Sequence, residues 1–163
     1  MGGLVDYFLK IDGIEGESAD AKHKGEIDVL SWSWGASQSG TMQFGGGGGA
    51  GKVQMQDFGF TMRINKATPK LFLKCANGEH IKSAILTARK AGKEQQEYLK
   101  LTFTDILVSS YQTGGSGDSD VVPIESISLN FAKIEFEYKE QKADGTLGGA
   151  IKTHWDLKAN KGG

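Results

Sequence analysis

The chain has one cysteine, two prolines and no excess of either charge. Because Cys75 stands alone among 163 residues, no internal disulfide can form, which is typical of a protein that folds in a reducing compartment. The 19 basic and 20 acidic residues leave a net charge of -1. A nucleic-acid-binding surface would require a clear positive excess. The composition therefore predicts no nucleic-acid partner.

Long hydrophobic runs are also missing. Residues 29–51 carry no charge, but they are rich in serine, glutamine and glycine, so their transfer into a bilayer would be unfavourable. The first residues, Met-Gly-Gly-Leu-Val-Asp, include neither a basic region nor an apolar segment, and a secretory signal peptide needs both. We therefore expect no membrane insertion and no signal peptide.

The bulk composition is that of a globular protein. Hydrophobic residues make up 38% of the chain and charged residues 24%, which is enough apolar material for one packed core. The 24 glycines are about twice the usual share and are expected at tight turns. We predict a single domain over residues 1–163.

Two tryptophans alternate with small polar residues near the start of the chain. In the order Ser31, Trp32, Ser33, Trp34, Gly35, a strand places both indoles on one face and both serines on the other. Two indoles form a large apolar surface that favours burial. The pattern predicts a strand over residues 26–35 with the tryptophans inward and the serines outward.

The connection that follows, over residues 37–52, is far longer than a hairpin needs, since most hairpin loops have about two to five residues. Its glycines lose much backbone entropy on ordering, so composition alone favours a flexible linker. A methionine and a phenylalanine have little use in a linker and indicate an arm that docks on another surface. The arm residues are Met42, Gln43, Phe44, Gly45, Gly46, Gly47, Gly48, Gly49, Ala50, Gly51 and Lys52.

The remaining chain reads mainly as strands. Thr68 as N-cap, Pro69 at the first helical position and Gly78 after the last predict one short helix over residues 69–77. The side-chain parity changes near Ala132, which indicates a bulge or sharp bend, and residues 159–163 are expected to fray. Strands are expected over residues 4–11, 26–35, 53–64, 81–90, 97–109, 123–138 and 151–157. This pattern predicts a mainly β fold: a small β-barrel of two packed sheets, with the short helix at its side and a long extended loop.

Candidate catalytic and ligand motifs are weak. Residues 46–52 fit a phosphate-binding loop, but Val53 stands where Ser or Thr should bind magnesium, and the next residues alternate like a strand instead of starting a helix. His23, His80 and His154 are scattered, and Cys75 with His80 is one pair, too few for a metal site. We expect no catalytic residue, no metal and no cofactor, and therefore no enzyme.

Several segments together resemble one known family. They are Leu30-Ser-Trp-Ser-Trp-Gly-x-Ser-Gln-Ser-Gly40, residues 45–52, Lys66-Ala-Thr-Pro69, Arg89-Lys-Ala-Gly92, Val108-Ser-Ser-Tyr-Gln-Thr-Gly-Gly115 and Ser128-Leu-Asn-Phe-Ala-Lys133. Their order and spacing closely resemble the haemolysin-coregulated protein (Hcp) family of bacterial type VI secretion systems. The likeness covers nearly the whole chain.

The resemblance implies a small β-barrel with one lateral helix. It also implies hexameric rings that stack into an inner tube, propelled by a contractile sheath, with small effector proteins carried inside the ring. The partners would be further copies of the chain, the spike protein, the sheath, the baseplate and the effectors. Such a protein is cytoplasmic before firing and is then secreted through the apparatus. The arm matches the family's extended loop, which contacts neighbouring subunits.

Strand parity adds a site hypothesis to this resemblance. If Trp32 and Trp34 face the core, Ser31 and Ser33 face outward, and one outer sheet face of a ring subunit lines the central hole. We therefore assign Ser31 and Ser33 to the lumen, where they contact effectors. An interface or open solvent is the alternative for Ser33. For the whole chain, the alternatives are a monomeric β-barrel binding module and a nucleotide-binding enzyme that uses residues 46–52.

Overall fold

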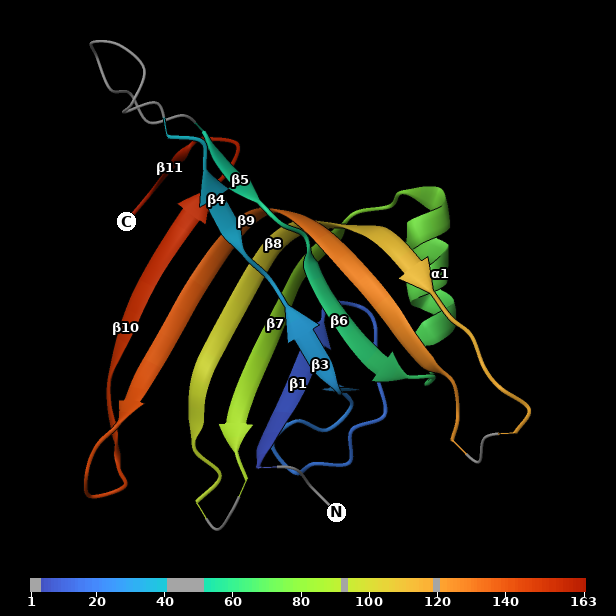
Figure 1. Cartoon of the computed structure of the whole chain (residues 1–163), viewed down its shortest axis with the longest axis horizontal. Helices are drawn as coiled ribbons and strands as arrows, with labels where there is room; N and C mark the ends of the chain where they lie inside the picture. The colour runs from blue at the N-terminus through green and yellow to red at the C-terminus, as the bar shows by residue number, and fades with distance from the viewer. Residues whose placement is uncertain (1–3, 41–51, 92–93, 119–120) are drawn as a thin grey trace.

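The structure is a computed structural model that describes residues 4–40, 52–91, 94–118 and 121–163 (Figure 1). One helix, α1 (Thr68–Asn77), accompanies eleven strands in this part of the chain. The strands are β1 (Val5–Ile11), β2 (Ile27–Val29), β3 (Ser31–Ser33), β4 (Ala36–Gln38), β5 (Val53–Met55), β6 (Phe58–Arg63), β7 (Ile81–Lys90), β8 (Glu97–Gln112), β9 (Ile124–Gln141), β10 (Leu147–Asp156) and β11 (Lys161–Gly162). The predicted mainly β fold is confirmed.

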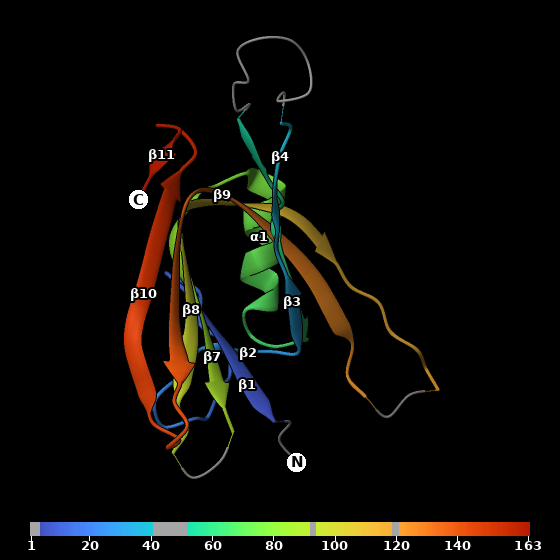
Figure 2. The ribbon, with the colours of Figure 1, turned by 60° about the vertical axis from the view of Figure 1, so that its left-hand side comes forward.

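Nine strands form one antiparallel sheet that folds over into two layers (Figures 1 and 2). The first layer follows the order β11-β10-β9-β8-β7-β1-β2. The early part of β9 also pairs with β6, and β6 pairs with β3, so these strands make the second layer. A separate hairpin of β4 and β5 extends from one end. The long strands β8 and β9 therefore contribute to both layers.

The fold-over depends on a change of parity in β8 and β9. Phe131 and Ile134 both face the core, as do Phe103 and Ile106 in β8, although strand side chains alternate with a period of two. Asp105, which lies between the two core residues of β8, adopts a left-handed conformation with φ 56°. The parity change predicted near Ala132 is confirmed as a bend shared by both strands. The register shift itself lies in β8, between Val108 and Ser110.

The core lies between the two layers and is built from the inward side chains of both. Trp32 and Trp34 are partly buried and pack against it, as the alternating pattern predicts. The Trp32 ring stacks on Phe58 with centroids 6.1 Å apart and meets the edge of Tyr7 at 5.9 Å. Aromatic contacts of this kind add to the free energy gained from burial.

Several sequence-based boundaries are wrong. The strand predicted over residues 53–64 is divided into β5 and β6, which belong to different sheets. The strand predicted over residues 26–35 breaks at Leu30, because β2 pairs with β1 in the first layer whereas β3 pairs with β6 in the second. The predicted arm begins too early, since Ser37 and Gln38 belong to β4 and pair with β5. The tail expected to fray instead contains β11, which pairs with Trp155 and Asp156 of β10.

The predicted helix is confirmed as α1, which begins one residue earlier than expected. Pro69 lies in its first turn, and Gly78 ends it at φ 69° with its N–H donated to the Lys74 carbonyl at 3.0 Å. The N-cap is Ala67, not Thr68 as predicted. The hydroxyl of Thr68 donates instead to Glu125, at 2.5 Å. In the described ranges, no helix has the length and apolar content needed to cross a membrane.

Candidate functional site: a hydroxyl-lined sheet face

The outer face of the second layer carries two rows of small polar residues. The strand registers place four positions side by side in each row, across β3, β6, β9 and β8. The first row is Ser31, Thr61, Ser126 and Gln112, and the second row is Ser33, Gly59, Ser128 and Ser110. Their strand neighbours Trp32, Phe60 and Ile127 belong to or pack against the core. We call this surface the hydroxyl face.

Hydrogen bonds connect the hydroxyl groups across neighbouring strands. Ser31 Oγ lies 2.6 Å from Thr61 Oγ1, and Ser128 Oγ lies within hydrogen-bond distance of both Ser109 Oγ, at 2.7 Å, and Ser110 Oγ, at 2.5 Å. The register shift in β8 allows two consecutive serines to reach the same partner. The hydroxyl face therefore carries two hydrogen-bonded groups of hydroxyls, one across β3 and β6 and one across β8 and β9, and each hydroxyl can both donate and accept.

Two charged residues, Asp57 and Arg63, lie at the two ends of β6, beyond these rows. Asp57, just before β6, accepts hydrogen bonds from Ser109 Oγ at 2.6 Å and Asn130 Nδ2 at 2.9 Å. Arg63 is the last residue of β6 and is exposed. Both rows between them are uncharged. The face therefore offers short-range hydrogen bonds and little long-range electrostatic attraction.

The face is shallow in its middle. Gly59 contributes no side chain there, and a Cβ built at this position would lie 3.6 Å from Ser33 Oγ. A groove of about 320 Å³ runs over β3, β6, β8 and β9. Hydroxyl groups and backbone line it, and its lining residues include no acid or base.

The structure brings together the predicted pair of serines and adds residues that the sequence did not reveal. Ser31 and Ser33 are both exposed on the same outer face, so the prediction that they face outward is confirmed. Ser110, Ser126 and Ser128 were missed because they come from distant strands. The alternation of Ser126 and Ser128 with buried residues marks them as outward, but nothing local shows which strand lies beside theirs.

The arm residues Met42, Gln43, Phe44, Gly45, Gly46, Gly47, Gly48, Gly49, Ala50 and Gly51 lie outside the described residues. Lys52 is described and exposed. The chain after Lys52 forms β5, whereas a phosphate-binding loop requires a helix at that place. The nucleotide-binding alternative therefore lacks the structural context that it needs.

Comparison with known proteins gives consistent matches along the chain. Residues 8–138 match the family model described as "Type VI secretion system effector, Hcp". Protein hcp1 of Pseudomonas aeruginosa is 53% identical over 158 residues, which are 96% of this chain and 97% of that protein. The crystal structure of Hcp1 from Salmonella typhimurium has a TM-score of 0.83 and 45% identity, covering 98% of this chain and 99% of that one. A further type six secretion system protein has a TM-score of 0.89 and 34% identity, covering 97% of this chain and 99% of that one.

A folded-over β-sheet with one lateral helix is thus a fold that this chain shares with proteins of type VI secretion. The chain belongs to the Hcp family of secreted type VI proteins. The family resemblance seen in the sequence is confirmed.

Proposed function

We propose that this chain is a structural subunit of the type VI inner tube, in which hexameric rings stack and the hydroxyl face lines the lumen. The observation that carries this proposal is the uncharged double row on the second layer. A wall of hydroxyls contacts a passing protein through many weak hydrogen bonds, each about 0.5–1.5 kcal/mol net. Such a surface retains and protects a small effector without holding it irreversibly.

The proposed partners follow from this role. They are further copies of the chain in a homohexamer and in stacked rings, the spike protein, the contractile sheath, the baseplate and small effector proteins. The protein is cytoplasmic before firing and is then exported by the apparatus itself. We propose no catalytic activity, because the groove of the hydroxyl face has no acid or base among its lining residues and the described part of the chain has no metal-binding cluster.

The oligomeric state of the purified protein tests the proposal. Size-exclusion chromatography with light scattering, together with native mass spectrometry, is expected to show a closed ring of six chains. A protein that remains a single chain at high concentration would support the monomeric binding module instead.

Ser33→Gln is expected to reduce effector retention by about tenfold, equivalent to about 1.4 kcal/mol, because the longer side chain fills the shallow groove beside Gly59. Ring assembly and thermal stability should remain unchanged, since Ser33 is exposed. Co-purification of an effector with wild-type and variant rings measures the effect. Ser116→Gln, an exposed position outside the hydroxyl face, is the matched control. Loss of the ring in Ser33→Gln would contradict the lumen assignment.

A second variant pair addresses the arm. Phe44→Ser, or deletion of residues 46–49, is expected to shorten stacked tubes while changing the melting temperature of the subunit little, because the arm is proposed to contact neighbouring rings. Phe44→Leu keeps an apolar side chain and should preserve stacking. Length distributions from negative-stain microscopy and thermal melting separate the two effects. Tubes of unchanged length would show that the arm does not contribute to stacking.

A further inference from the structure

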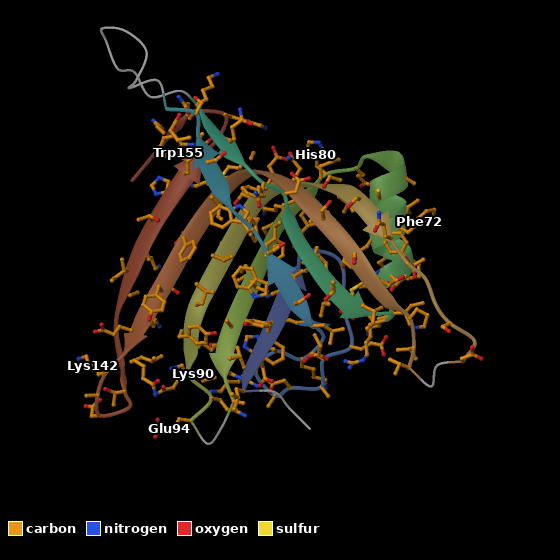
Figure 3. All side chains as sticks on the ribbon, in the orientation of Figure 1. Phe72, His80, Lys90, Glu94, Lys142 and Trp155 are labelled. Atoms are coloured by element: carbon orange, nitrogen blue, oxygen red, sulfur yellow. The ribbon has the colours of Figure 1, made fainter. Side chains whose placement is uncertain are left out.

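Helix α1 has a second apolar stripe that the subunit itself does not bury. Leu71 faces the core, whereas Phe72 and Leu73 are each 55% exposed. Together with the exposed Pro69 and Ala76, they recur at i, i+3, i+4 and i+7, the spacing of one helix face. Phe72 lies on the outer side of the helix (Figure 3) and meets the edge of Tyr111, with ring centroids 5.9 Å apart. We call this face the helix stripe.

The opposite side of the molecule has an apolar cleft. The second layer does not extend over β10, so the inward face of β9 and β10 stays partly open (Figure 1). The cross-strand partners Tyr138 and Ile151 are exposed there, Ile151 by 66%. Beside them, a cleft of about 730 Å³ separates β9–β11 from the β4–β5 hairpin. Its aromatic and aliphatic lining consists of Trp34, Val53, Met55, Ile134, Phe136 and Trp155.

Size and lining distinguish this cleft from ordinary exposed apolar surface. Its volume and aromatic lining are those of a binding site. The indole nitrogens of Trp34 and Trp155 are already enclosed by the subunit itself, so a partner in the cleft would contact the apolar parts of the lining side chains. The chemistry of the cleft therefore matches an apolar partner.

The helix stripe and the cleft lie towards opposite ends of the molecule, with α1 at one end of the long axis and β10 at the other (Figure 1). A ring of identical subunits requires two different and complementary patches on each chain. An exposed amphipathic helix with anchors at i, i+3, i+4 and i+7 binds typically in a hydrophobic groove. The two unpartnered surfaces satisfy this requirement in chemistry and in placement.

We propose that the helix stripe of one subunit packs into the Trp34–Trp155 cleft of the next copy and forms the joint within the ring. This inference rests on the proposed tube function and assigns the two surfaces that meet. Phe72 and Leu73 pack against Phe136 in the cleft and against Ile151 beside it, so aromatic and aliphatic anchors lie at the centre of the interface.

Leu73→Glu and Ile151→Glu test the joint from its two sides. Each places a carboxylate in an interface that excludes water, and each is expected to weaken subunit association by more than about 100-fold. Both positions are exposed in the single chain, so circular dichroism of the monomer should be unchanged. Leu4→Glu is the matched control, because Leu4 is 91% exposed and lies outside both surfaces; it should assemble like the wild type.

Mixing the two variants gives the sharper result. Leu73→Glu retains an intact cleft and Ile151→Glu retains an intact helix stripe, so an equimolar mixture has one functional joint. Native mass spectrometry is expected to show a heterodimer that grows no further. Two results would overturn the proposed joint but not the tube function. One is that Leu73→Glu assembles like the wild type, and the other is that the mixture stays monomeric under conditions in which wild-type rings are intact. A wild-type protein that never assembles would overturn both the proposed joint and the proposed tube function.

Discussion

Arg89→Met is expected to lower the free energy of unfolding by about 3–5 kcal/mol, because it removes the cation from a buried ion cluster. Arg89 is buried on β7. Its Nη1 and Nη2 atoms donate to the two carboxylate oxygens of Asp20 at 2.9 and 2.8 Å, and Nη2 also donates to Asp6 at 3.3 Å. The guanidinium stands 4.7 Å from the centroid of the Phe8 ring. Its removal would leave these carboxylates together without a counterion.

The surroundings of Arg89 make this decrease in the free energy of unfolding larger than the decrease caused by removing a surface ion pair. Burial, with smaller contributions from the charges of Asp6 and Asp20, raises the pKa of Asp28, so the region is already unfavourable for negative charge. Urea unfolding followed by circular dichroism measures the effect. Arg63→Met is the matched control, because Arg63 is exposed and its replacement should cost less than about 1 kcal/mol. Equal losses in the two variants would contradict a structural role for the cluster.

The pH dependence of stability gives an independent readout. The hydrogen bonds from Arg89 are the largest cause that lowers the pKa of Asp20, from 3.8 to about 2. Because the folded-state pKa lies below the unfolded one, this stabilisation is complete above about pH 4 and is lost as the pH falls towards 2. Wild-type stability should therefore decrease through this window. Arg89→Met should lack the part of this decrease that Asp20 causes.

Glu125→Leu is expected to destabilise the subunit by about 2–4 kcal/mol, because it leaves two hydroxyl donors without their acceptor. Glu125 lies on β9 and is 0% exposed. One carboxylate oxygen accepts from Thr68 Oγ1 at 2.5 Å, and the other accepts from the Tyr111 hydroxyl. These bonds tie the first turn of α1 to β8 and β9. The carboxylate also lies near the helix N-terminus, where the dipole favours negative charge.

A double-mutant comparison distinguishes this loss from a packing defect. In the wild type, Tyr111→Phe should lower the free energy of unfolding by about 1 kcal/mol, the net contribution of one hydrogen bond. In the Glu125→Leu background it should have little effect, because the acceptor is already absent. Glu135→Leu, at a partly exposed position of the same strand, is the matched control and should have a small effect. Additive losses from Tyr111→Phe and Glu125→Leu would show that the hydroxyl and the carboxylate act independently.

Local signals predicted the elements that depend on neighbouring residues. Pro69 and Gly78 bound the helix because each has a fixed backbone preference at a helix end. The alternation around Trp32 correctly placed the serines outward, because strand parity depends only on adjacent residues. The same local rule did not reveal the break at Leu30. The polarity pattern continues unchanged there while the pairing partner changes from β1 to β6.

Features that depend on residues far apart in the sequence could not be predicted from such local signals. Asp105 adopts a left-handed conformation that an aspartate tolerates but does not require, so the bend in β8 carried no clear mark in the sequence. The cleft exists because the second layer ends before β10, and the length of one strand says nothing about what covers it. The helix stripe could be found in the sequence by its spacing, but only the structure shows that the subunit leaves it exposed.

The sequence by itself determined the family, the mainly β fold with one helix, and the outward side of Ser31 and Ser33. Only the tertiary structure decided that Thr61, Ser126, Ser128 and Ser110 join those serines on one face. It also decided that Arg89 of β7 meets Asp20, which lies between β1 and β2. The physical reason is that alternation and capping act over a few residues. The register of strands brought together from distant parts of the chain is set by how the whole core packs.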